Sequence, residues 1–88
     1  MLLQLMISGR QIRAARALLN FDQSKLAELS SLSLTTIQHM EASDGVFPGQ
    51  VASLMKLLDA LDKAGIELIS DNATGGRGVR LKKVQKSH

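Results

Sequence analysis

Apolar residues recur at helical spacing through most of the chain, and this pattern predicts a mainly α-helical fold with four short helices. The first helix is expected to begin near Ser8 and to end near Leu19. Ser8 and Gln11 match the S-x-x-Q pattern of a capping box, in which two side chains satisfy N–H groups at the start of a helix. Ile12, Ala15 and Leu19 form the expected inner face.

The segment QSKLAELSSLSLTTIQHME, from Gln23 to Glu41, predicts two further helices with a tight break between them. Asp22 is a favourable N-cap for the first of these, whose Leu26 and Ala27 are expected to point inward. A small side chain at Ala27 lets the next helix cross close above it.

The break between these two helices is predicted at Ser30 and Ser31, where the apolar pattern is interrupted. Ser33 can cap the second helix, and Ile37 and Met40 share its inner face at i, i+3. Two helices joined at a steep angle by so short a turn form a helix-turn-helix, and the second of them can enter the major groove of DNA.

A fourth helix is predicted after Pro48, which suits the first position of a helix, with a stop at Gly65. Met40 and Met55 are interpreted as core fillers and not as metal ligands. The apolar positions of the fourth helix follow helical spacing at Val51, Leu54, Met55, Leu58 and Leu61.

The tail changes to the period of a β-strand, with strands expected over residues 66–70 and 79–84 and a turn-rich loop between them. The predicted organisation is one domain of residues 1–88, in which 8–65 form the helical core and 66–84 form a β-hairpin or strand pair. Because an isolated two-stranded hairpin is marginal in water, the tail must pack on the fourth helix or pair with another chain. The second option makes it a dimerisation element.

Over roughly residues 10–64 the chain resembles the lambda-repressor-like (Cro/C1-type, XRE family) helix-turn-helix proteins. The segments RAARALLNFD and VASLMKLLDAL flank the part that carries the resemblance. Ser31 departs from the family pattern, which usually has Gly in the turn. Because the turn residue needs a positive φ, which is uncommon outside Gly, we expect a strained or slightly rearranged turn. The matching positions are Gln23, Leu26, Ala27, Leu32, Ile37, Met40 and Glu41.

The resemblance implies an ion pair between Arg16 and Glu41 that ties the first helix to the third. Arg16 lies beside the inner face of its helix, where an unpaired charge would be costly. Glu41 follows Ile37 by one helical turn, close to the inner face of its own helix. The alternative is that both side chains point to water. Arg10 and Arg13 are expected to be solvated or near phosphates.

The basic residues are placed unevenly along the chain. The net charge is +3, but five of the eleven Lys and Arg residues lie in the last twelve positions. Residues 1–76 hold six basic and eight acidic side chains, a net charge of −2, and no Lys or Arg occurs between Lys25 and Lys56. The helix expected to enter the DNA groove therefore has no cation of its own.

Composition gives no support for catalysis, a metal site or a bound cofactor. The chain has no Cys, and His39 and His88 are its only histidines. Its two aromatic residues, Phe21 and Phe47, are too few for a platform that stacks single-stranded nucleic acid. The lack of Cys fits a cytoplasmic location.

The leading MLLQLMI segment is apolar but far too short to span a membrane, and it lacks the basic start and cleavage site of a signal peptide. It is expected to be disordered or to pack on an apolar patch, and the alternative is an extra strand or a dimer contact. Met6 is a second natural start, since Ser8 then opens the first helix.

The predicted function is sequence-specific binding of double-stranded DNA by a homodimeric, non-enzymatic transcriptional regulator. Side chains at the start of the third helix and one turn further on are expected to face the groove, and groups at helix starts to hold phosphates. The groove-facing residues are Leu34, Thr35, Gln38 and His39, and the phosphate-binding residues are Gln23, Ser24 and Ser33. The alternative, favoured by the missing cations, is a protein-interaction module of the same fold, such as an antitoxin-like partner of a toxin, with weak or no DNA binding.

Overall fold

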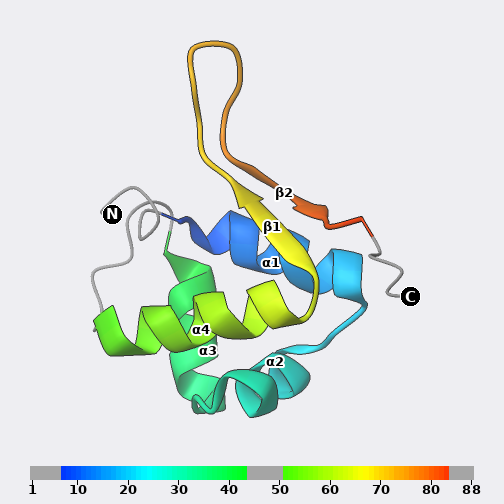
Figure 1. Ribbon diagram of the computed structural model, residues 1–88. Helices are drawn as coiled ribbons and strands as arrows, with labels where there is room; N and C mark the ends of the chain where they lie inside the picture. Colours follow the sequence, from blue (N-terminus) through cyan, green and yellow to red (C-terminus); the bar gives the residue numbers. More distant parts are fainter. Residues whose placement is uncertain (1–6, 44–50, 84–88) are drawn as a thin grey trace.

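Figure 1 shows the computed structural model, which describes residues 7–43 and 51–83. These residues form a mainly helical domain, as predicted, with four helices and a two-stranded antiparallel sheet. None of the described helices is long and apolar enough to cross a membrane. The elements in chain order are α1 (Gly9–Leu19), α2 (Gln23–Ser30), α3 (Leu34–Ala42), α4 (Val51–Lys63), β1 (Ile66–Ile69) and β2 (Gly78–Leu81).

The three predicted helix starts, at α1, α2 and α3, are confirmed. Ser8 and Gln11 form the reciprocal capping box of α1, with N···O distances of 2.9 and 3.2 Å. Asp22 caps α2 by accepting a hydrogen bond from the N–H of Lys25 at 2.7 Å. Ser33 caps α3 in the same way at 3.1 Å. Each cap fixes where its helix begins, and so sets the length of the connection before it.

The predicted end of the fourth helix is also confirmed. α4 stops at Lys63, and Gly65 has a φ of 98°, a conformation that residues with a side chain rarely adopt. The helix start predicted at Pro48 lies outside the described residues, as does the leader before Ile7. Ile7 itself is buried in the core.

The core lies where the four helices and the inner face of the sheet meet (Figure 1). The predicted inner face of α1 is confirmed, since Ile12 and Ala15 are buried and Leu19 packs half-buried against them. Met40 is a core residue, as predicted. The largest fully buried side chains are Ile12, Leu26, Ile37, Met40, Leu57 and Leu61.

The inner face of α4 differs from the predicted one. Leu54 and Leu61 are buried as expected, but Val51 and Met55 are 59% and 53% exposed, so the interpretation of Met55 as a core filler is wrong. α4 carries two overlapping apolar stripes, and the stripe that includes Leu57 faces the core. Both stripes fit helical spacing, and the packing of α4 on α2 and β1 selects between them.

The tail forms a hairpin that packs on its own chain. The sheet register pairs Ile66 with Leu81 and Leu68 with Val79, which places these four side chains on the same face. Ile66 is buried, and Leu68 and Val79 pack against the core. β1 contacts α4 and β2 contacts α1 (Figure 1). The hairpin was expected either to pack on the fourth helix or to pair with another chain, and packing against the helices is observed. This packing does not use the outer edges of the strands, so they could still pair with a second chain.

Gln11, a residue that is only 5% exposed, fastens the hairpin to α1 through its side chain. Its amide nitrogen donates hydrogen bonds to the backbone oxygens of Ile69 and Gly78, at 3.2 and 3.0 Å. Its amide oxygen accepts the capping-box hydrogen bond from Ser8. One residue of each strand is thereby tied to the start of α1.

Gln11→Leu should lower the free energy of unfolding by about 1–3 kcal/mol, the usual cost of leaving buried polar groups without their partners. The two strand oxygens lose a donor and the Ser8 N–H loses its acceptor, while most of the buried volume is kept. Urea unfolding measures the loss, and Gln38→Leu, at an exposed Gln of α3, is the matched control with an expected change within about 0.5 kcal/mol. Equal losses in the two variants would contradict the bridging role of Gln11.

Candidate nucleic-acid interface

The turn between α2 and α3 depends on Ser31, whose backbone is left-handed with φ 59° and ψ 35°. The positive φ predicted at this position is confirmed, at a cost of about 1–2 kcal/mol for a residue other than Gly. The turn keeps the hydrogen bonds of a helix C-cap, from Ser31 N–H to Glu28 O at 3.3 Å and from Leu32 N–H to Ala27 O at 3.0 Å. α3 therefore leaves the turn in a defined direction although the residue at the left-handed position is not Gly.

Ser30 stands at a buried position at the end of α2. Its hydroxyl donates a hydrogen bond to the backbone oxygen of Leu26 at 2.7 Å, so the polar side chain is satisfied by its own helix. Leu32, in the turn, is half-buried against the core. The serines of the break interrupt the apolar pattern without opening a gap between the two helices.

α3 has one buried and one exposed face. The buried face carries Ile37, Met40 and Glu41 and lies against α1 and α2. The opposite face collects the four residues predicted to face the DNA groove, and each of them is exposed: Leu34, Thr35, Gln38 and His39. Their spacing of i, i+1, i+4 and i+5 places them on one side of a helix.

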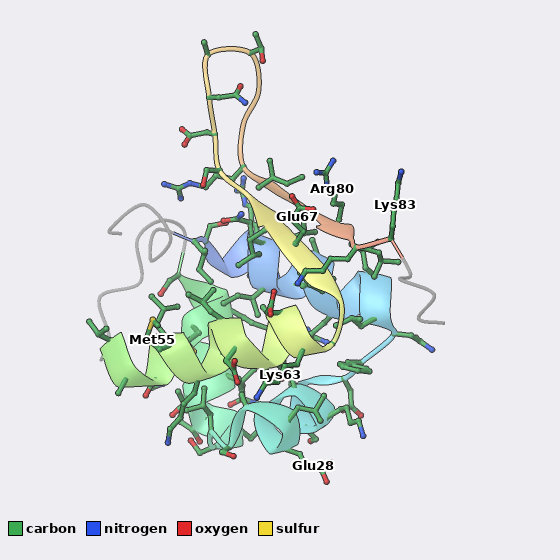
Figure 2. The ribbon with its side chains drawn as sticks, viewed as in Figure 1. Glu28, Met55, Lys63, Glu67, Arg80 and Lys83 are labelled. Atoms are coloured by element: carbon green, nitrogen blue, oxygen red, sulfur yellow. The ribbon has the colours of Figure 1, made fainter. Side chains whose placement is uncertain are left out.

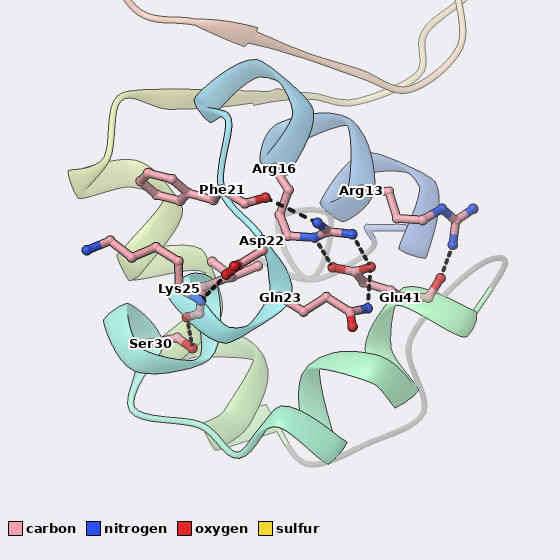
Figure 3. A network of polar contacts seen from close by, with 9 residues as sticks. Arg13, Arg16, Phe21, Asp22, Gln23, Lys25, Ser30 and Glu41 are labelled. Atoms are coloured by element: carbon pink, nitrogen blue, oxygen red, sulfur yellow. Dashed lines mark hydrogen bonds and ion pairs between the residues drawn. The ribbon is translucent and has the colours of Figure 1, made fainter.

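Arg16 and Glu41 form the ion pair that the resemblance implies (Figure 3). Nε and Nη2 of Arg16 donate to the two carboxylate oxygens at 2.6 and 2.9 Å. The side chain of Glu41 is 4% exposed and that of Arg16 is 21% exposed, so the pair is mostly buried between α1 and α3. The hydrogen bond to Glu41 raises the pKa of Arg16 above its ordinary value, which keeps the guanidinium charged.

Gln23 and Phe21 complete the network around this pair. Nε2 of Gln23 donates to Oε1 of Glu41 at 3.0 Å, and the backbone oxygen of Phe21 accepts from Nη1 of Arg16 at 3.2 Å. One set of hydrogen bonds thus joins α1, the start of α2 and α3 (Figure 3). This network engages one of the two N–H groups of the Gln23 amide, so the second N–H and the backbone N–H of Gln23 remain as donors.

Arg13 binds the end of α3 through one nitrogen of its guanidinium. Nη1 donates to the backbone oxygen of Glu41 (Figure 3). The last carbonyl groups of a helix have no intrahelical donor, and a cation nearby satisfies them. The expectation that Arg13 is solvated or near phosphates is therefore wrong for this nitrogen, although the side chain as a whole is exposed.

Gly9 is a residue that sequence reasoning missed. Its N–H donates to the backbone oxygen of Ser43 at 2.7 Å, where the start of α1 meets the end of α3. A Cβ at this position would lie 2.2 Å from the backbone oxygen of Glu41 and 2.5 Å from that of Ser43. The only signal in the sequence is a glycine in the first turn of a helix, where it has no local role.

The starts of α2 and α3 hold the remaining predicted phosphate ligands. Ser24 and Ser33 are both exposed. The hydroxyl of Ser33 also donates to Oγ1 of Thr36 at 2.9 Å, besides its capping role. The first N–H groups of a helix have no intrahelical acceptor, so these two helix starts can bind anions without a cationic side chain.

Cations are scarce on the exposed surface of α2 and α3, because α2 has Lys25, α3 has no Lys or Arg, and two cations of the tail are paired within the chain. Arg80 forms a two-bond ion pair with Glu67 at 2.9 and 3.0 Å on the hairpin (Figure 2), and this pair lowers the pKa of Glu67. Lys82 pairs with Asp62 of α4. Within the described residues, the tail cations without an ion pair are Arg77 and Lys83, and Figure 2 shows Lys83 pointing away from the sheet.

Comparisons with known proteins assign no family to the chain. No protein-family model matches it, and no curated protein matches its sequence. Within the described ranges, 7–43 and 51–83, no group of three or more His, Cys, Asp or Glu residues is placed to hold a metal ion. The exposed surfaces of the helices are therefore the basis for inferring a function.

Proposed function

We propose that this chain is a small transcriptional regulator that binds double-stranded DNA sequence-specifically and reads the major groove with α3. The observation that carries the proposal is the exposed face of α3, where Leu34, Thr35, Gln38 and His39 lie together. α2 and α3, joined at Ser31, would act as a helix-turn-helix of the lambda-repressor-like kind. The buried network behind α3 supports this role, because base reading needs a helix that is held rigidly.

The side chains of α3 suit contacts to base edges. A Gln amide matches the donor and acceptor of adenine, so Gln38 is expected to bond an adenine bidentately. Leu34 or the methyl group of Thr35 would contact a thymine methyl group. The proposed phosphate ligands are the backbone N–H of Gln23 and the hydroxyl groups of Ser24 and Ser33.

The proposal includes a homodimer. One α2–α3 unit covers little DNA surface and carries a single Lys or Arg, Lys25 of α2, so it needs a second half-site to bind tightly. A two-fold dimer would set the two α3 helices on half-sites about 34 Å apart, one turn of DNA. The proposed dimerisation element is the tail, residues 66–84, and a dimer would bring together the basic side chains of two tails.

A second candidate function is a protein-interaction module, for example an antitoxin-like partner of a toxin. The shortage of cations on α2 and α3 favours it, and so do Leu29 and Leu34, which are 44% and 41% exposed on these helices. A purified chain that selects no sequence from random duplex DNA, yet binds a protein through these leucines, would support this candidate over the first.

Replacing Gln38 or Thr35 by Ala should lower the affinity for the preferred DNA site by about 1–3 kcal/mol for each base that is no longer bound. Both side chains are exposed, so their removal leaves the fold intact. The preferred site is obtained by selecting bound fragments from random duplex DNA, and the variants are titrated against it. Ser53→Ala, at a partly exposed Ser of α4 that lies outside α2, α3 and the tail, is the matched control. Variants that bind as tightly as the unchanged protein would show that α3 does not read the bases.

Arg77→Gln and Lys83→Gln should weaken binding to specific and random DNA alike and should make binding less dependent on salt. For each phosphate that is no longer neutralised, the slope of log affinity against log salt concentration falls by about 1. Lys63→Gln is the control, because Lys63 lies on α4 and pairs with Asp59 at 3.0 Å. Titrations over a range of salt concentrations give the slopes. An unchanged slope in both tail variants would remove the role of these two residues in binding phosphates.

A further inference from the structure

A groove of about 280 Å³ lies beside β1, between the sheet and α4. Ile66, Glu67, Leu68, Ile69 and Ser70 line it in unbroken succession. Neighbouring residues of a strand point to opposite faces, so a groove touches all of them only where it follows the edge of the strand. The groove therefore runs along the free edge of β1.

The walls of this groove suit an apolar strand. The apolar residues opposite β1 are Ile7, Leu58 and Leu61. The charged residues that line the groove are already paired, Asp62 with Lys82 and Glu67 with Arg80. An incoming strand would consequently cover apolar surface without burying an unpaired charge.

The backbone of β1 presents hydrogen-bonding groups to the groove. Lys82 N–H donates to Gly65 O across the sheet at 2.8 Å. In an antiparallel pair, the backbone N–H and C=O groups of alternate residues point to the partner strand. Those of Gly65 and of every second residue after it therefore point to β2. The backbone groups of Ile66, Leu68 and Ser70 point to the groove. Among the described residues, the sheet has two strands, so the edge of β1 that faces away from β2, with the N–H and C=O of Leu68, pairs with no further strand. Such an edge favours the addition of another strand.

We propose that β1 of a second copy of this chain occupies the groove, antiparallel to the first, and joins two hairpins into one four-stranded sheet. The inference rests on the homodimer proposed above and names its interface. With the two-fold axis at Leu68, the N–H and C=O of Leu68 meet those of Leu68 in the other copy, and those of Ile66 meet those of Ser70. This register is self-complementary, as a two-fold interface requires.

The edge of β2 is less suited to the same pairing. Lys83, just past the end of β2, has no ion pair among the described residues, and like charges on an edge strand oppose its pairing with a second copy. From residue 66 to residue 70, β1 and the residue after it contain no Lys, Arg or Pro. Charge therefore directs a second copy to β1.

The inner face of the continued sheet would stay apolar across the dimer. Leu68 lies on the inner face of the hairpin, so Leu68 of the second copy would lie on the same side, next to the wall formed by Leu58 and Leu61. Edge hydrogen bonds would set the register, and these leucine contacts would supply the apolar burial.

Leu68→Cys in the full chain tests this interface by oxidation without DNA. The chain has no other Cys, so a disulfide dimer reports one contact. The proposed register brings the two Cα atoms at position 68 to about 5.5 Å, within the roughly 4.4–6.8 Å that a disulfide spans. Val79→Cys is the matched control, because Val79 lies opposite Leu68 on β2 and shares its face. Ser70→Cys tests the register, since its copies would lie too far apart to join.

The expected result is a disulfide dimer mainly with Leu68→Cys. A dimer that forms best with Val79→Cys would overturn the choice of edge, and one that forms best with Ser70→Cys would overturn the register.

Amide hydrogen exchange of Leu68 in the unsubstituted protein gives an independent measurement that needs no variant to fold. Protection that rises with protein concentration, in step with dimer formation by sedimentation, is expected. Protection of this amide in a monomer would mean that another segment of the same chain covers β1, and an unprotected amide in a dimer would place the interface elsewhere.

These outcomes are separable from those of the proposed function. Sequence-specific DNA binding without any Leu68→Cys dimer would overturn the interface and leave the regulator proposal standing. A Leu68→Cys dimer that selects no DNA sequence would support the interface and contradict the regulator proposal.

Discussion

Gly9→Ala should lower the free energy of unfolding by about 3 kcal/mol or more, at the upper end of the usual range for overpacked sites. The added Cβ would lie 2.2 Å from the backbone oxygen of Glu41 and 2.5 Å from that of Ser43. Neither oxygen belongs to a side chain that can rotate away, so α1 must move off the end of α3. That movement would also lengthen the 2.7 Å hydrogen bond from Gly9 N–H to Ser43 O.

Whether Gly9→Ala lowers or raises stability distinguishes the contact between α1 and α3 from the helix propensity of residue 9. In an open helix, Gly→Ala stabilises by about 1 kcal/mol, so only the close backbone contact predicts a loss. Gly76→Ala is the matched control, because nothing lies within 4 Å of the Cβ it would add. Its expected change is within about 0.5 kcal/mol. Chemical denaturation compares the two variants, and a gain of stability for Gly9→Ala would show that α1 and α3 do not make this contact in solution.

Helix starts were predictable from the sequence because the interactions that make them are local. Ser8, Asp22 and Ser33 each accept a hydrogen bond from an N–H three residues further along the chain. A short stretch of sequence therefore contains both partners. The left-handed turn at Ser31 was predictable from the resemblance alone, because the proteins that the chain resembles usually have Gly at this position.

Contacts between distant segments were not predictable in this way. Gly9 meets residues more than thirty positions away, and Gln11 bonds to Ile69 and Gly78 of the hairpin. The buried face of α4 was not predictable for the same reason. Helical spacing fits two apolar stripes on this helix, and only packing against other elements determines that the stripe with Leu57 is buried. A pattern along one helix carries no information about which of its faces another element will cover.

The same distinction between local and long-range contacts applies to the candidate interface. Once Ile37 and Met40 are assigned to the core, the helical period leaves Thr35 and Gln38 on the outer face. The engagement of Gln23 by Glu41 was not predictable, because the carboxylate accepts it only after α1, α2 and α3 have met. The exposed face was thus predictable from the sequence, whereas the network that holds it in place was not.

Arg16→Met should destabilise the domain by about 3–5 kcal/mol, because it leaves the carboxylate of Glu41 buried without a countercharge. That side chain is 4% exposed, and Gln23 would be its remaining side-chain donor among the described residues. Met keeps much of the apolar stem of Arg, so the loss reports the charge more than the packing. Glu41→Gln should cost less, since Arg16 is 21% exposed and can turn its charge to water.

A double-mutant cycle on Arg16 and Glu41, followed by chemical denaturation, separates the pair from the packing of each side chain. The control cycle uses Glu67 and Arg80, which have the same two-bond geometry at 2.9 and 3.0 Å but side chains that are 44% and 65% exposed. Water screens the exposed pair, so its coupling should be small and that of the buried pair much larger. Equal coupling in the two cycles would mean that burial adds nothing to the Arg16–Glu41 pair. α3 would then be held in place by the apolar packing of its inner face instead.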